Sequence, residues 1–226
     1  MTLILHAHPL SSYCHKVLIA LYEAGTPFES RHVDLGDPAA RAKFMTISPW
    51  GKMPALEDKA RREIVFETSI IVEYLDRHYP GPHPLLPADE DARLQARLWD
   101  RVFDLYVQGP MGAAVMATIR GEPERIPEHA EALLASYRQI EAHMAGREWA
   151  AGSTFSLADC AAAPALFYAR VVAPFPDDHP AIAAYFERLI ARPSVARTLV
   201  EARPWFHMYP YRDRLEPRFL GEASTG

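Results

Sequence analysis

The stretch Pro49-Trp-Gly-Lys-Met-Pro-Ala-Leu-Glu-Asp58, together with the ten residues that follow it up to Thr68, decides how the first part of the chain folds. Ala55–Asp58 and Glu63–Phe66 have the composition of two short strands. The basic turn Lys59–Arg62 separates them, so we expect a β-hairpin.

Both ends of this hairpin offer backbone groups to a ligand. Pro54 begins the first strand, where its missing N–H removes no ladder hydrogen bond. Met53, just before it, can present its own N–H and C=O to a peptide, as a vacant strand edge does. Thr68 begins an apolar-periodic run and is predicted to be a helix N-cap. Because helix N-termini attract carboxylates, a peptide-like anion could pair at Met53 and dock at Thr68. A capped hairpin in some other α/β protein is the alternative.

Composition narrows the class of protein. The 226 residues are 49% hydrophobic and 23% charged, which is typical of a globular protein with ample core. The net charge is −5 and the basic residues are scattered, which argues against a nucleic-acid surface. No apolar run reaches the roughly 18 residues of a membrane helix, and Met1–Leu3 leads into a strand rather than a signal peptide. Cys14 and Cys160 are too few for a disulfide framework, so a cytoplasmic location is expected.

The segment before the hairpin has the pattern of a βαβ unit. Leu3–Ala7 and Phe28–Val33 are predicted strands on either side of a helix from about Tyr13 to Ala24. Such a unit implies parallel pairing and a right-handed crossover. A short helix is expected over Asp37–Met45, and another over Thr68–His78 after the hairpin.

A proline-rich segment divides the chain. Residues 79–87 contain four prolines and one glycine, which indicates a stiff, extended linker. Every periodic segment after it is helical. We therefore expect residues 1–79 to form one domain of order βαβ-α-ββ-α, residues 80–87 to form a linker, and residues 88–226 to form a helical domain with an aromatic tail.

Two segments of the helical part are informative. Arg93–Gln108 has apolar residues on two sides, which is typical of a helix packed between others, and Pro110 is expected to kink or interrupt it. Ser156-Leu-Ala-Asp159 has the form of a capping box with aspartate in place of glutamate. The alanine-rich helix that follows, Leu157–Val171, is predicted to be the buried centre of the bundle.

With these residues in view, the chain resembles the cytosolic glutathione transferase family over nearly its whole length, as a serine-type (theta-, zeta- or phi-like) bacterial member. Ser11–Val17 resembles the active-site turn of serine-type members. Lys52–Leu56 resembles the loop in which a cis-proline presents the preceding residue to the cysteinyl backbone of glutathione. Glu67–Leu75 resembles the family's γ-glutamyl-binding motif, and Ser156–Asp159 its C-terminal capping element. The resemblance implies a thioredoxin-like N-terminal domain followed by an all-helical C-terminal bundle.

The first motif implies activation of a thiol. A free thiol of pKa near 8.5 is only a few per cent thiolate at neutral pH. A hydroxyl that donates to sulfur beside a helix N-terminus stabilises the thiolate, and the resemblance assigns this role to Ser11, with Ser12 as the rival. Tyr13 follows the two serines where the zeta class has cysteine, which argues against a maleylacetoacetate isomerase. Cys14 is expected to be a small buried residue, with a mixed disulfide to glutathione as the minority interpretation.

The resemblance also assigns the contacts with glutathione. Glu67 is expected to bind the amine of the γ-glutamyl group and Thr68 its carboxylate. Lys52 is expected to pair with the glycine carboxylate, with Arg41 or Lys43 as alternatives. The implied glutathione-binding set is Ser11, Lys52, Met53, Pro54, Glu67 and Thr68.

The second substrate is expected to meet the sulfur in an apolar cleft. Five apolar or aromatic residues are candidates to line it: Leu10, Tyr13, Tyr106, Met111 and Trp205. Core packing is the competing explanation for each. No metal is expected, because the histidines near the N-terminus lack a second group at ligand spacing.

The sequence is therefore interpreted as a glutathione S-transferase that delivers glutathione as its thiolate to a small hydrophobic electrophile. The resemblance implies a homodimer. A glutathione-dependent isomerase, ether-cleaving enzyme or dehalogenase is the alternative among enzymes. A non-catalytic binding or scaffold module on the same fold is the alternative from another class.

Overall fold

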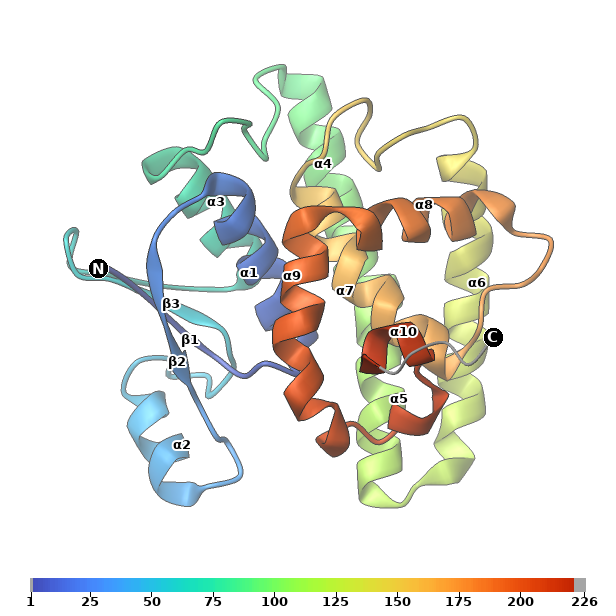
Figure 1. The fold of residues 1–226 in the computed structure, drawn as a ribbon, viewed down its shortest axis with the longest axis horizontal. Coiled ribbons are helices and arrows are strands. Elements are labelled where there is room, and N and C mark those ends of the chain that lie inside the picture. Colours follow the sequence, from blue (N-terminus) through green and yellow to red (C-terminus); the bar gives the residue numbers. More distant parts are fainter. Residues whose placement is uncertain (1, 222–226) are drawn as a thin grey trace. The chain divides into compact units, whose positions relative to one another are not determined.

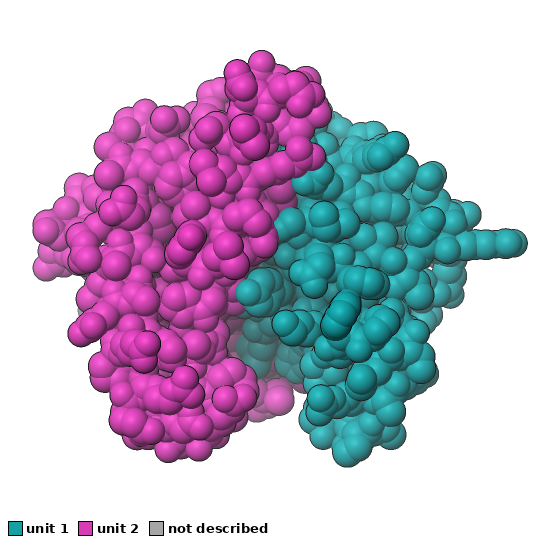
Figure 2. Space-filling model, turned by 180° about the vertical axis from the view of Figure 1, so that it is seen from behind, with its two compact units in different colours: residues 1–86 teal, residues 87–226 magenta. Residues whose placement is uncertain are grey.

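The computed structural model describes residues 2–221 and divides into two compact units. Unit 1 comprises Met1–Leu86 and unit 2 comprises Pro87–Gly226; Figure 2 colours them separately. The last five residues of the expected aromatic tail lie outside the described residues.

Unit 1 is a four-stranded mixed sheet with helices (Figure 1). The strands are ordered β2-β1-β3-β4, with β1 parallel to β2 and antiparallel to β3. This confirms the predicted βαβ unit and the hairpin, and the thioredoxin-like fold class. The elements are β1 (Leu3–Ala7), α1 (Ser12–Ala24), β2 (Phe28–His32), α2 (Pro38–Met45), β3 (Ala55–Asp58), β4 (Glu63–Phe66) and α3 (Thr68–His78).

Burial patterns explain how the helices of unit 1 are placed. Every residue of β1 is buried, as expected for a central strand with neighbours on both edges. Helix α1 ends at Gly25, whose φ of 63° supplies the left-handed turn that glycine adopts without steric penalty. Helix α2 is anchored through Phe44, which packs with Val33 and Ala55 in a small apolar cluster.

The register of the sheet brings three chain segments to one edge. His6 of β1 pairs with Ala55 of β3, and Ala55 pairs with Phe66 of β4. The end of β1, the start of β3 and the end of β4 therefore coincide. As a consequence α1, which follows β1, and α3, which follows β4, begin at the same edge where the loop before β3 arrives.

Unit 2 is helical (Figure 1). Its central element is α7, which packs against α4, η1, α5 and α8 and is buried at nearly every position. Among residues 2–221 no helix is both long enough and apolar enough to cross a membrane. The elements are α4 (Glu90–Val102), η1 (Phe103–Gln108), α5 (Gly109–Arg120), η2 (Pro123–Arg125), α6 (Ile126–Met144), α7 (Leu157–Val172), α8 (Pro180–Ala191), α9 (Pro193–Ala202), η3 (Arg203–Met208), η4 (Arg212–Arg214) and α10 (Pro217–Leu220).

The predicted capping box opens α7. Asp159 is fully buried, and its carboxylate accepts from the N–H of Ser156 at 2.8 Å and the hydroxyl of Ser156 at 3.0 Å. It also accepts from the N–H of Ala150 at 2.9 Å and the hydroxyl of Tyr185 at 2.6 Å. One carboxylate thus ties the start of α7 to the preceding loop and to α8.

Helices α4 and α5 are joined by η1, a π-helical segment that interrupts the α-helix just before Pro110. Pro110 lies in the first turn of α5, where a missing N–H is tolerated. In a regular helix that N–H would reach the carbonyl of Tyr106. The Ser136 hydroxyl of α6 lies within hydrogen-bond distance of this carbonyl, at 2.7 Å, and of the carbonyl of Ala132, at 2.9 Å.

The tail packs onto unit 2 as far as it is described. Phe206, Tyr209 and Phe219 are buried, which explains the aromatic composition of this segment. Arg218 donates twice to Glu187 of α8, at 2.7 and 2.8 Å, and fixes α10 there.

Candidate functional site

The turn between β1 and α1 is held by two histidines. His8 accepts the N–H of Leu10 through Nδ1 at 3.1 Å, and its carbonyl accepts the N–H of Ser11 at 3.0 Å. His15 Nε2 lies 2.6 Å from the carbonyl of Pro9. Burial and the neighbouring His32 lower the pKa of His8, which keeps its ring neutral and able to accept. These contacts set the position of Ser11.

Ser11 is the N-cap of α1. Its Oγ accepts the N–H of Cys14 at 3.3 Å, and the residue is partly exposed. Because a hydroxyl can accept and donate at once, the cap leaves the Ser11 O–H able to donate to a ligand. Ser12 is the first residue inside the helix and is buried.

Cys14 is fully buried in the first turn of α1. Burial raises the pKa of its thiol to about 11, although a hydrogen bond with Ser11 acts in the opposite direction. A thiol of that pKa is almost entirely protonated at neutral pH and is a poor nucleophile. Cys160 is also fully buried, in the first turn of α7.

The loop before β3 presents Met53. The Met53–Pro54 peptide bond is cis, as the resemblance implied. The buried Ser48, which sequence analysis did not single out, donates to the carbonyl of Lys52 at 3.0 Å and fixes the loop. Within residues 2–221 neither the N–H nor the C=O of Met53 has a hydrogen-bond partner. The Lys52 side chain is exposed.

The start of α3 differs from the prediction. Thr68 is the first helical residue and not the N-cap; the cap is Glu67, whose φ is 69°. This left-handed backbone turns β4 into α3 without a loop, which pattern analysis could not reveal for a glutamate. No side chain caps the helix, and the Thr68 hydroxyl has no hydrogen-bond partner among the described residues. The first N–H groups of α3 therefore remain able to bind an anion.

Sequence analysis also missed a buried lysine beneath this helix start. Lys16 of α1 is only 1% exposed, and its Nζ donates to the Ser69 hydroxyl at 3.0 Å. This contact ties α1 to the first turn of α3. The only available signal was its position on the apolar face of α1.

The register of the sheet brings the predicted glutathione-binding residues to one edge. Ser11 follows β1, Met53 precedes β3, and Glu67 follows β4, and these strand ends are aligned. The edge can pair with a short extended peptide at Met53, take a carboxylate at the α3 N-terminus, and donate a hydroxyl to a third group at the α1 N-terminus. Contact of each residue with glutathione stays a prediction.

The residues expected to line the electrophile site come from both units. Leu10 is partly buried and Tyr13 is exposed, both in the turn at the start of α1. In unit 2, Tyr106 is 59% exposed and Trp205 is partly buried, whereas Met111 is buried and packs inside the bundle. Their role toward an electrophile also stays a prediction.

The other basic residues that could pair with the glycine carboxylate lie on α2. Arg41 and Lys43 are both exposed. In the part of the chain that the structure describes, no group of three or more histidine, cysteine, aspartate or glutamate side chains could hold a metal ion.

Comparison with known proteins identifies the family. Sequence models of the glutathione S-transferase N-terminal and C-terminal domains match residues 10–78 and 102–193. The chain is similar to glutathione S-transferase 3 of Zea mays, with 32% identity over 86% of this chain and 92% of that protein. It is also similar to a stringent starvation protein A homolog of Haemophilus influenzae, with 30% identity over 85% of this chain and 87% of that protein.

A solved structure agrees with this assignment. The crystal structure of a glutathione S-transferase from Methylobacillus flagellatus, with GSH bound, superposes with a TM-score of 0.77 and 27% identity, over 87% of this chain and 98% of that one. The matched domains span both units, and the relatives are covered almost end to end. The chain belongs to the glutathione S-transferase family.

Proposed function

We propose that this protein is a glutathione transferase that binds glutathione at residues 1–79 and uses it as a thiolate. The aligned edge of the sheet carries the proposal: a free peptide edge at Met53, an uncapped helix start at Thr68 and a hydroxyl donor at Ser11 occur together. Glutathione has a peptide backbone, a terminal carboxylate and a thiol, which match these three groups. The solved relative with GSH bound supports the same ligand.

In this proposal the cysteinyl backbone of glutathione pairs with the N–H and C=O of Met53. The γ-glutamyl carboxylate accepts from the Thr68 hydroxyl and the first N–H groups of α3, where the helix dipole is positive. Glu67 pairs with the amine, and Lys52 pairs with the glycine carboxylate. The tripeptide is thereby held at each of its three residues before any chemistry occurs.

The chemical step begins with loss of the thiol proton to solvent. The Ser11 hydroxyl donates to the sulfur beside the α1 N-terminus, and both effects favour the thiolate. The thiolate attacks the electrophilic carbon of a small hydrophobic substrate, a C–S bond forms, and the leaving group departs with its electron pair. Leu10, Tyr13, Tyr106 and Trp205 are proposed to contact that substrate, whereas Met111 packs inside the bundle.

Calorimetric titration with glutathione tests the proposal, with the isomeric tripeptide that carries an ordinary α-glutamyl linkage as the control. The isomer has the same charge and thiol, but its carboxylate cannot reach α3 when the cysteine pairs at Met53. We expect glutathione to bind at least about tenfold more tightly, a difference of about 1.4 kcal/mol. Equal affinities would contradict the assigned site.

A non-catalytic binding module is the second candidate, because one relative of similar identity is a stringent starvation protein A homolog. The two candidates differ in turnover. A transferase should conjugate a chlorodinitrobenzene electrophile faster than free glutathione does at the same pH. Binding of glutathione without any such acceleration would favour the binding module, or an isomerase, ether-cleaving enzyme or dehalogenase with one dedicated substrate.

We also propose that the protein is a cytoplasmic homodimer. Leu94, Leu98 and Leu105 lie on α4 and η1 at helical spacing and are 61%, 49% and 57% exposed. Exposed leucines on neighbouring turns indicate an interaction surface, and a second copy of the chain is the proposed partner. Leu98→Glu should shift the mass measured by light scattering from dimer to monomer, whereas Glu128→Lys, on α6, should leave it unchanged.

A further inference from the structure

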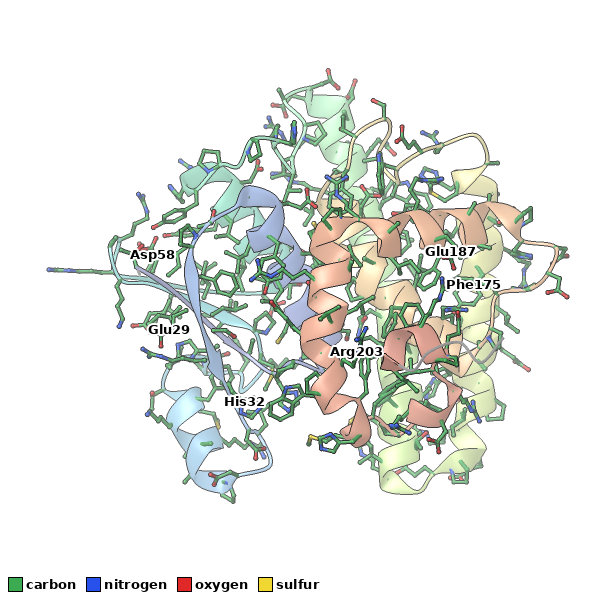
Figure 3. All side chains as sticks on the ribbon, in the orientation of Figure 1. Glu29, His32, Asp58, Phe175, Glu187 and Arg203 are labelled. Carbon is green, nitrogen blue, oxygen red and sulfur yellow. The ribbon has the colours of Figure 1, made fainter. Side chains whose placement is uncertain are left out.

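A pocket of about 330 Å³ lies in unit 1 where α2 meets the sheet. Its walls come from His6 of β1, from β2 and from the inner face of α2. Figure 3 shows His32 at the end of β2 nearer to α2, with Glu29 farther along the same strand. None of the six residues assigned above to glutathione binding lines this pocket. Lys43 of its wall is an alternative partner for the glycine carboxylate of glutathione, so the inference below takes Lys52 as that partner and otherwise goes beyond the proposed function.

One wall of the pocket is apolar. Val33, Phe44 and Ile47 line it, and the first two belong to the cluster that fixes α2 to the sheet. The volume is near the lower end of the range for ligand sites, about 300–1,000 Å³, so a molecule with one ring fits better than a larger ligand. An aromatic ring would add to the His6–Phe44 pair, whose ring centroids are 6.2 Å apart.

A second wall is cationic. Lys43 lines the pocket, and its ammonium makes no ion pair or hydrogen bond with any of residues 2–221. Arg31 also lines it, but this guanidinium is partly neutralised by Glu29 at 2.6 Å and by Glu57 at 3.9 Å. Lys43 is therefore the principal donor for an anionic group.

The buried His6, which also lines the pocket, supplies an acceptor. It is 4% exposed, and its Nε2 lies 3.4 Å from a carboxylate oxygen of Glu57. Since a carboxylate only accepts, the Nε2 must carry the hydrogen, and a neutral ring then has an acceptor at Nδ1. Burial lowers the pKa of His6, which favours that neutral ring. Within the described residues Nδ1 has no hydrogen-bond partner.

We propose that this pocket binds a small hydroxyaryl carboxylate, with its ring on Phe44 and Val33, its carboxylate at Lys43, and its phenolic hydroxyl donating to His6 Nδ1. Each part of the ligand is complementary to one group of pocket residues. The apolar wall takes the ring, the lysine takes the charge, and the buried acceptor distinguishes a phenol from an unsubstituted ring.

Titration calorimetry with para-hydroxybenzoate tests this proposal, with benzoate and phenol as matched ligands that lack one polar group each. We expect one molecule of para-hydroxybenzoate to bind with a dissociation constant of about 1 mM or below. Benzoate and phenol should each bind about tenfold more weakly. Equal binding of all three compounds, or no binding of para-hydroxybenzoate at about 10 mM, would overturn the proposal.

Three variants locate the binding. Lys43→Gln should weaken para-hydroxybenzoate about tenfold and leave phenol unchanged, whereas Arg41→Gln, on the same helix but outside the pocket wall, should change neither. Ala40→Leu places a larger side chain in the pocket wall and should abolish binding, with circular dichroism confirming the fold. Equal effects of the Lys43 and Arg41 variants would overturn the assignment. Displacement of para-hydroxybenzoate by glutathione would also overturn it, because the two sites are separate here.

Discussion

Replacing Ser11 by alanine and by aspartate separates the two roles that this hydroxyl has in the proposed site. The Oγ accepts the N–H of Cys14 at 3.3 Å and so caps α1. In the proposed complex the same O–H donates to the sulfur of glutathione. Ser11→Ala removes both interactions, and Ser11→Asp restores the cap without restoring the donor, because an ionised carboxylate can only accept.

The two losses have different magnitudes and different readouts. Loss of an N-cap costs about 1 kcal/mol in the free energy of unfolding. Loss of a hydrogen bond to a charged sulfur costs about 1.5–3 kcal/mol of thiolate stabilisation, which is about one to two pKa units on bound glutathione. If the parent holds the thiol ionised at neutral pH, turnover there should fall about 10- to 100-fold, and it should recover as the pH rises.

Ultraviolet titration of enzyme-bound thiolate measures the pKa directly, and urea unfolding measures the cap. Ser11→Ala should raise the pKa of bound glutathione and lower stability, whereas Ser11→Asp should abolish thiolate formation with stability near the parent's. Ser12→Ala is the matched control, because Ser12 is the neighbouring serine and is already inside the helix. Its bound thiol should keep the parent's pKa.

The reasoning would be refuted if Ser12→Ala raised the pKa of bound glutathione and Ser11→Ala did not. The activating hydroxyl would then be one residue farther along. No change in either variant would remove both serines from the activation step, and the N-terminus of α1 alone would have to account for it.

Three further predictions concern the buried groups. Asp159→Ala should lower the free energy of unfolding by about 3–5 kcal/mol, because four donors lose their acceptor. The control Asp178→Ala, on the surface, should change that free energy by less than about 0.5 kcal/mol, and urea denaturation of both variants measures the difference. Cys14→Ala should keep most conjugation activity, and in the native parent Cys14 should resist alkylation at pH about 8, because burial raises its pKa to about 11; rapid labelling without unfolding would contradict this. Burial lowers the pKa values of His6 and His8 below the ordinary value of about 6.5, so the folded state binds fewer protons and stability should fall as the pH drops from about 7 toward 5. His6→Gln should make that fall shallower in unfolding measured at each pH, and an unchanged slope would count against it.

The strands of the hairpin could be predicted because local signals agreed. Ala55–Asp58 and Glu63–Phe66 combine strand composition with a polar turn, and the structure has strands with those bounds. The capping box at Ser156 was equally local, since its partner Asp159 is three residues away.

Features that depend on distant partners could not be predicted in the same way. The cap of α3 was placed one residue too late because nothing in the pattern shows that Glu67 adopts a positive φ. The π-helical form of the interruption before Pro110 could not be predicted, because the pattern does not show that Ser136, on another helix, lies within hydrogen-bond distance of the Tyr106 carbonyl. The burial of Lys16 depends likewise on its contact with Ser69 of α3.

The proposed glutathione site also combines local features, which the sequence predicts, with a long-range feature, which it does not. Its residues were assigned from three short motifs. The alignment of those motifs at one edge of the sheet is a property of the register, in which His6 pairs with Ala55 and Ala55 with Phe66. A one-residue slip of β3 would move Met53 away from the helix starts. It would also turn the side chains of β3 to the opposite face of the sheet.

The π-helical segment Phe103–Gln108 has a consequence for how the gene can change. A π-turn holds one more residue than an α-turn, so α4 and α5 are out of phase by one residue, or about 100° around their common axis. Loss of a single codon here would leave an unbroken α-helix from Glu90 onward. It would also rotate α5 by about 100°, so that Met111 and Ala114 left the core and Gly112 and Val115 took their positions. A one-residue deletion that keeps the backbone helical would thus change which residues of α5 are buried.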